Sequence, residues 1–189
     1  MGTCPTGSQT VGPFFHLGLA DFYRDNLVSP GVSHEKIAIR GRVLDADGNG
    51  VNDAMLEIWQ ADSQGKFHEA KEAAEKSGAE GFWGFGRIPT NPEGGFHFTT
   101  IKPGRVPGPG GAHQAPHIVV TIFMRGLLKQ LTTRIYFPGE PANEEDAVLR
   151  LIPPARRGTL IAARAPEKSG ELEWNVILQG ANETVFFDC

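Results

Sequence analysis

The sequence is poor in cysteine, has no excess of basic residues and contains no long apolar run. Its two cysteines, Cys4 and Cys189, stand near opposite ends, so we expect reduced thiols and no disulfide framework. Eighteen basic and 22 acidic residues give a net charge of −4 at pH 7, which argues against a nucleic-acid partner. No stretch approaches the roughly 20 apolar residues of a membrane span, and no secretory signal is visible. We therefore expect a soluble, cytoplasmic protein.

The 189 residues suffice for one domain and are rich in turn formers, with 24 glycines and 14 prolines. Between the turns, apolar and polar residues alternate over short segments, the pattern of half-buried strands. No long helices alternate with these segments. The pattern predicts an all-β fold, a single β-sandwich domain with long loops. The expected strands are residues 36–44, 54–61, 96–101, 117–124, 131–137, 160–164, 172–179 and 184–187.

Three segments depart from the strand pattern. Residues 1–35 carry glycine and proline without a hydrophobic period, which predicts an irregular N-terminal arm, with the sandwich over 36–189. Residues 62–81 form a polar excursion that could hold a helical turn. Residues 143–150 predict a short helix, with Asn143 as its N-cap and acidic residues in the first turn.

The residues alone do not assemble a catalytic set. His113 and His117 are four residues apart, but Pro116 lies between them and prevents the helix that would bring both to one metal. No Gly-x-Ser-x-Gly elbow is present, and both cysteines are terminal. The residues favour loop and core roles for the histidines, and a metal site using His113 and His117 stays open as a disfavoured hypothesis.

Several segments, in order along nearly the whole chain, resemble the intradiol ring-cleaving dioxygenases. The central ones are Leu56-Glu57-Ile58-Trp59-Gln60-Ala61-Asp62, Thr100-Ile101-Lys102-Pro103-Gly104, Ala115-Pro116-His117-Ile118 and Thr133-Arg134-Ile135-Tyr136-Phe137. The arm residues 8–14 and the tail 179–188 also match. The resemblance implies O₂-dependent cleavage of a catechol-type ring between its two hydroxyl-bearing carbons. It further implies a non-haem ferric ion held by two tyrosines and two histidines.

The sequence departs from this ligand pattern. His117 matches the first ligand histidine, but Val119 stands at the second, Val106 at one ligand tyrosine, and residues 72–76 contain no tyrosine. Gln114 stands where the family has a catalytic arginine. Since one imidazole cannot hold Fe(III), the resemblance implies no catalytic or metal-binding residue in this chain. The chain resembles the iron-free α chain of two-chain family members, whose partner β chain carries the iron.

In such members each α–β pair shares one active site. The resemblance then implies a hetero-oligomer of α–β pairs, in which the arm packs on the partner and contributes to the binding of a small aromatic substrate. We expect Arg125 to bind the ring carboxylate of that substrate, because a guanidinium matches a carboxylate in bidentate geometry. The expected substrate-binding residues are Thr10, Gly12, Pro13, Phe14 and Arg125.

A second hypothesis remains open. The chain could be a β-sandwich binding or structural module without a catalytic role, in which Arg125 is a surface residue at a hairpin end and the arm only packs. The match at the arm and at Arg125 discriminates between the two, because a generic sandwich needs neither feature.

Overall fold

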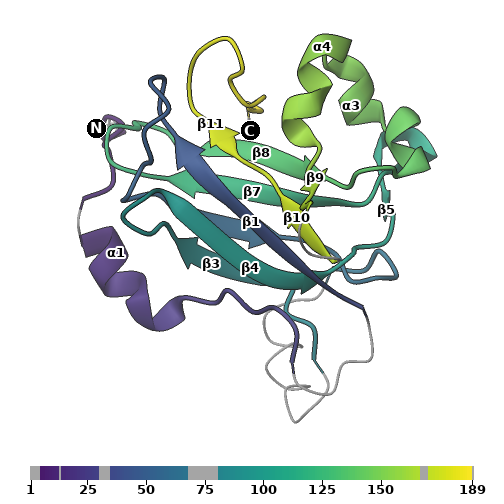
Figure 1. Ribbon diagram of the computed structural model, residues 1–189, viewed down its shortest axis with the longest axis horizontal. Helices are drawn as coiled ribbons and strands as arrows, with labels where there is room; N and C mark the ends of the chain where they lie inside the picture. The colour runs from purple at the N-terminus through teal and green to yellow at the C-terminus, as the bar shows by residue number, and fades with distance from the viewer. Residues whose placement is uncertain (1–4, 13, 30–34, 68–80, 167–169, 189) are drawn as a thin grey trace, which may run out of the picture.

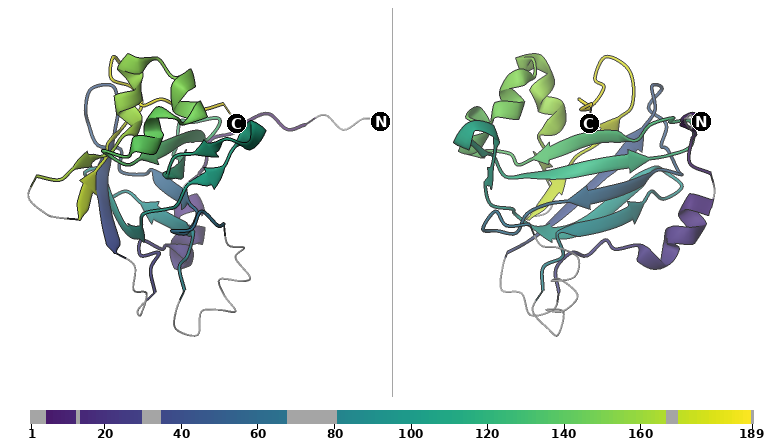
Figure 2. Two further views of the ribbon diagram at one scale, coloured as in Figure 1. Left: turned by 90° about the vertical axis from the view of Figure 1, so that its right-hand side faces the viewer. Right: turned by 180° about the vertical axis from the view of Figure 1, so that it is seen from behind.

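A computed structural model describes residues 5–12, 14–29, 35–67, 81–166 and 170–188. Two β-sheets pack face to face, and short helices lie at their edges (Figures 1 and 2). The prediction of an all-β sandwich is confirmed. Most of the buried apolar side chains, including Ile39, Leu56, Phe98, Ile118 and Ile135, form one cluster between the sheets.

The first sheet is organised around its longest strand, β1 (Lys36–Leu44). Strand β4 (Gly95–Ile101) pairs with it antiparallel on one side, while β10 (Glu171–Glu173) and β11 (Val176–Ile177) pair parallel on the other. Strand β9 (Ala163–Arg164) extends the sheet beyond β10. Trp174, in the connection between β10 and β11, passes close to Gly41 of β1. A Cβ on Gly41 would lie 1.7 Å from the carbonyl oxygen of Trp174, so this position requires glycine.

The second sheet has the order β3-β2-β7-β8 and is antiparallel throughout. Its strands are β2 (Met55–Trp59), β3 (Phe85–Pro89), β7 (His117–Phe123) and β8 (Leu131–Tyr136). Burial alternates along β7, as expected for a strand with one face on the core. The expected hairpin between residues 117 and 137 is confirmed, and Arg125 and Gly126 lie in its turn.

The N-terminal segment is more ordered than the prediction of an irregular arm. It contains helix α1 (Phe14–Leu19) and the 3-10 helix η1 (Ala20–Phe22). Isolated bridges then join Arg24 to Arg87 and Asn26 to Thr99, and Leu27 is fully buried in the core. Residues 5–10 are exposed, and the chain extends away from the body toward its N-terminus (Figure 2, left). Within the predicted arm, residues 24–28 therefore belong to the sandwich.

At the end of the sandwich opposite α1, loops and short helices form a small helical cap beside β5 (Val106–Pro107) and β6 (His113–Gln114) (Figure 1). The prediction that Asn143 caps a helix over 143–150 is wrong. A 3-10 helix η3 ends at Glu144, and Asp146 caps α3 by accepting hydrogen bonds from the amides of Val148 and Leu149. The remaining bounds are η2 (Pro109–Gly111), η3 (Pro141–Glu144), α3 (Ala147–Leu151), α4 (Pro154–Arg157) and η4 (Gly158–Leu160).

The expected strand boundaries differ from the structure where backbone partners are few. The aromatic, glycine-rich segment 82–87 was not among the expected strands, yet β3 includes its last residues. The expected strand 184–187 makes one isolated bridge, Thr132 to Phe187. Most of the polar excursion, residues 68–80, lies outside the described residues. Among the described residues, no helix has the length and apolar character needed to cross a membrane.

Candidate functional site

Strand β7 connects two regions that the sequence singled out. His117 begins the strand on the side of β5 and the helical cap, and Arg125 follows its end on the side of α1 (Figure 1). Eight residue steps along an extended chain span about 25 Å, so the two side chains belong to separate regions. We call them the histidine network and the arginine pocket, and define each below.

His117 is buried, with 7% of its surface exposed. Its Nδ1 donates to the carbonyl oxygen of Ala115 at 2.8 Å, and its ring lies 5.7 Å from the ring of Tyr136, its partner on β8. Burial lowers the pKa of His117 to about 4, and the nearby guanidinium of Arg134 acts in the same direction. At neutral pH the imidazole is therefore uncharged.

Polar side chains around His117 bond to one another. Arg134 Nη1 donates to Gln114 Oε1 at 2.7 Å and lies 3.3 Å from the Tyr136 hydroxyl, which donates to Asp146 Oδ1 at 3.2 Å. Asp146 Oδ2 accepts from the amide of Ala115 at 2.7 Å. Burial raises the pKa of Tyr136 to about 12, so its phenol stays protonated. The histidine network comprises Gln114, Ala115, His117, Arg134, Tyr136 and Asp146.

This region does not fit a ferric ion. At the positions that match the family's ligands, Val106 is buried with 4% exposure and Val119 faces Arg134 across the β7–β8 pair. Neither apolar side chain can ligate a metal. His113 is exposed on β6 while His117 is buried, and no group of three or more potential ligands occurs among the described residues. The geometry therefore gives no support to a rearranged metal centre at His113 and His117.

The arginine pocket is a cavity of about 430 Å³ at the opposite end of β7. The structure brings two of the predicted substrate-binding residues, Gly12 and Arg125, into its lining. Phe14 lies on α1 with 82% exposure and outside the lining, and Pro13 lies outside the described residues. The lining residues are Val11, Gly12, His16, Leu17, Asp53 and Arg125.

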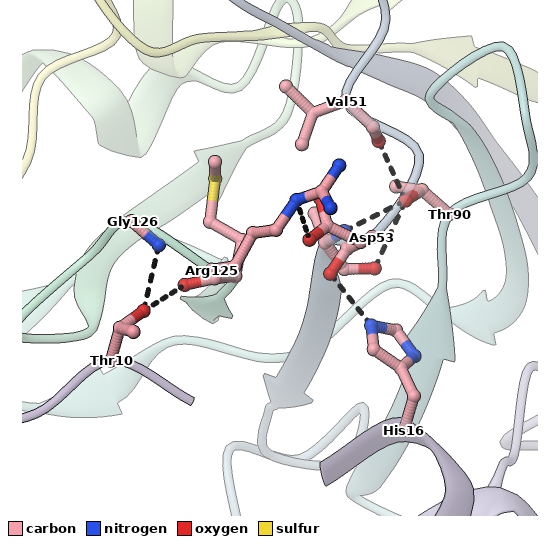
Figure 3. A network of polar contacts seen from close by, with 9 residues as sticks. Thr10, His16, Val51, Asp53, Thr90, Arg125 and Gly126 are labelled. Atoms are coloured by element: carbon pink, nitrogen blue, oxygen red, sulfur yellow. Dashed lines mark hydrogen bonds and ion pairs between the residues drawn. The ribbon is translucent and has the colours of Figure 1, made fainter. Parts of the chain in front are cut away.

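Thr10, another predicted substrate-binding residue, holds the turn that carries Arg125 (Figure 3). Its hydroxyl accepts from the amide of Gly126 at 2.7 Å and lies 3.4 Å from the carbonyl oxygen of Met124. Gly126 has a φ of +89°, a conformation that glycine adopts without strain. The arm and the β7–β8 turn are therefore joined on both sides of Arg125.

Sequence reasoning missed Asp53 and His16. Asp53 Oδ2 lies 2.9 Å from Arg125 Nε, and the backbone carbonyl of Asp53 accepts from His16 Nε2 at 2.7 Å. The signal lies in the strand register: Met55 pairs with Phe123, so continuing the antiparallel ladder by two residues places Asp53 opposite Arg125. That register joins segments about 70 residues apart, which hydrophobic alternation alone does not fix.

Comparisons with known proteins agree with the resemblance found in the sequence. A family model described as a dioxygenase matches residues 16–180. The chain is 41% identical to the protocatechuate 3,4-dioxygenase alpha chain of Burkholderia cepacia, over 97% of this chain and 96% of that protein. It is 30% identical to the beta chain from the same organism, over 94% and 77%. Among solved structures, a dioxygenase domain from Streptomyces sp. SirexAA-E superposes with a TM-score of 0.64 at 27% identity, over 86% of this chain and 89% of that one.

Proposed function

The chain belongs to the dioxygenase family, and we propose that it is the iron-free α subunit of a protocatechuate 3,4-dioxygenase. With a β subunit that holds the non-haem Fe(III), it forms a shared active site for intradiol, O₂-dependent cleavage of protocatechuate to 3-carboxy-cis,cis-muconate. The resemblance to intradiol dioxygenases is confirmed by the family match and by the relatives at 30% and 41% identity. The assembly is a cytoplasmic hetero-oligomer of α–β pairs.

One observation carries this proposal: the chain keeps the fold of the family without its ligand set. By the sequence resemblance, Val106 and Val119 stand at the family's ligand positions, and in the structure the polar groups around His117 bond to one another. A second chain must then supply the metal. The similarity to both an alpha and a beta chain supports a partner of related sequence.

The contribution of this chain is substrate binding through the arginine pocket. Arg125 is 76% exposed, so its guanidinium is accessible to an anionic ligand. A carboxylate on an aromatic ring would bind it through charge-assisted hydrogen bonds. Gly12, also exposed, lets the backbone come close to a small ligand.

The arm supplies the surface that contacts the partner. Phe14, Leu17 and Phe22 expose 82%, 70% and 64% of their surface on α1 and η1. Clustered exposed apolar side chains mark interaction sites. In the assembled pair the β subunit covers these residues, and an obligate interface at the upper end of about 2,000–5,000 Å² or beyond is expected.

The test is reconstitution with the β subunit. Product formation from protocatechuate and O₂ uptake are measured for this chain alone, for the β subunit alone and for the mixture. We expect no turnover by this chain alone and, in the mixture, turnover with a lower KM for protocatechuate than the β subunit shows. A mixture in which the two chains neither associate nor change the KM would instead support a binding or structural module without a catalytic role.

A further inference from the structure

The carboxylate of Asp53 pairs with the guanidinium of Arg125, and both residues line the arginine pocket (Figure 3). The two charged groups meet at 2.9 Å through Nε of the arginine. The partners differ in exposure: the Arg125 side chain is 76% exposed, while that of Asp53 is 27% exposed. An exposed arginine normally samples many rotamers, so a partly buried partner restricts it more than another mobile side chain would.

Asp53 is itself fixed by hydrogen bonds on its backbone. His16 Nε2 donates to its carbonyl oxygen at 2.7 Å. The amide of the next residue, Ala54, donates to the buried hydroxyl of Thr90 at 3.1 Å, and that hydroxyl lies 2.8 Å from the carbonyl oxygen of Val51 (Figure 3). These bonds tie the turn before β2 to α1 and to the segment after β3. The carboxylate therefore projects from a rigid point.

The contact leaves part of the guanidinium accessible. A guanidinium presents five N–H donors in a planar fork, and pairing through Nε engages its side edge. The end of the fork, formed by Nη1 and Nη2, can then receive a ligand carboxylate in bidentate fashion. Thr10 fixes the backbone of the same turn through the amide of Gly126. Backbone and side chain of Arg125 are thus held by separate contacts.

We propose that Asp53 is a positioning residue that orients Arg125 for the carboxylate of the aromatic substrate and so contributes to the preference for carboxylate-bearing catechols. This inference rests on the proposed function, in which Arg125 binds that carboxylate. An arginine held in its bound orientation loses less side-chain entropy when the ligand arrives, which strengthens binding. Asp53 acts through Arg125 and does not itself contact the substrate.

A competing effect has the opposite sign. The negative charge of Asp53 repels a ligand carboxylate, so its removal alone would tighten binding. Positioning and repulsion therefore predict opposite changes in KM when Asp53 loses its side chain. This opposition makes the sign of the change the decisive observation.

The experiment uses the complex with the iron-bearing β subunit and compares protocatechuate with catechol, which lacks the carboxylate. Asp53→Ala is expected to raise KM for protocatechuate about 2- to 10-fold, with kcat unchanged and KM for catechol unchanged. Asp53→Asn, whose amide oxygen can still accept from Arg125 Nε, should fall between the wild type and Asp53→Ala. It also tests the proposal if Asp53→Ala fails to fold. Glu145→Ala, which removes the partner of exposed Arg105 at the other end of the molecule, is the matched control and should change neither KM.

A double-mutant cycle with Arg125→Ala separates this inference from the function on which it rests. In the Arg125→Ala background, Asp53→Ala should have no further effect on KM for protocatechuate. A lower KM in Asp53→Ala, equal changes for both substrates, or effects that add to those of Arg125→Ala would overturn the positioning role alone. An unchanged KM in Arg125→Ala would overturn the assignment of Arg125 and the inference together.

Discussion

The two ends of β7 use similar chemistry in opposite ways. At the histidine network, Arg134, Tyr136 and Asp146 bond to one another, and Asp146 is fully buried. At the arginine pocket, Arg125 is paired on one side only and stays 76% exposed. In the histidine network the polar side chains bind one another, whereas in the arginine pocket the guanidinium stays accessible. The family fold has therefore become a scaffold at one end of the strand and a candidate binding surface at the other.

Under the proposed function, this difference explains how a chain whose described residues include no cluster of potential metal ligands contributes to a shared active site. Buried hydrogen bonds that satisfy every partner rigidify a region, and substitution there is expected to damage the fold. An exposed charge that is held in place contributes little to the fold but can select a ligand. Substitutions at the two ends should accordingly separate into effects on stability and effects on KM.

Asp146→Ala should cause the largest loss of stability. The substitution removes the cap of α3 and leaves the buried amide of Ala115 without its acceptor, which together cost about 2–5 kcal/mol. Thermal and urea unfolding of the chain, alone and with its partner, measure the loss. The control is Asp45→Ala, since that carboxylate makes similar bonds to amides in an exposed turn. Equal losses for the two variants would remove the contrast between a structural and an exposed end.

Acid should destabilise the histidine network through His117. Its folded pKa of about 4 lies below the unfolded value near 6.5, so the unfolded chain binds more protons in between. The contribution of the neutral His117 imidazole to the free energy of unfolding is complete above pH 6.5. It is lost as the pH falls toward 4, by up to about 3 kcal/mol. We compare unfolding free energies of the wild type and His117→Phe across this range, with exposed His113→Gln as the control. A pH-independent difference between wild type and His117→Phe would contradict the buried, neutral assignment.

At the other end, Arg125→Ala should alter binding without altering stability. The loss of a charge-assisted hydrogen bond costs about 1.5–3 kcal/mol, or roughly 10- to 150-fold in KM for protocatechuate. KM for catechol, kcat and iron content should stay near wild type. Arg105→Ala, which removes another exposed and paired arginine, is the control. If both substrates change by the same factor, Arg125 does not bind the carboxylate.

The smallest effect is expected at the interface. Leu17 is 70% exposed on α1, and its burial against the partner is worth about 1–2 kcal/mol. Leu17→Ser should therefore weaken association roughly 5- to 30-fold, as measured by analytical ultracentrifugation of the two chains. Leu151→Ser, at an 85% exposed position beside the histidine network, is the comparison. If Leu151→Ser weakens association more than Leu17→Ser, the interface lies at the end of β7 that carries the histidine network, and the proposed interface is wrong.

The sequence was most informative where local pattern and structure coincide. The alternation in 117–124 and 131–137 predicted the hairpin that carries both regions. The sequence was least informative where contacts between distant segments determine how side chains pair. The pairing of Asp53 with Arg125 depends on the β2–β7 register, and Asp146 caps α3 in place of Asn143 while also bonding to Ala115 and Tyr136. Helix α1 escaped prediction because its six residues show no clear period.

The central claim is that the iron belongs to the partner and that this chain completes its site. The most direct measurement is iron per chain, by elemental analysis and visible absorption, for this chain purified alone and for the purified complex. The account predicts a colourless, iron-free chain, and iron with a visible tyrosinate-to-iron band in the complex in proportion to the β subunit. Stoichiometric iron with a visible band in the pure isolated chain would contradict it.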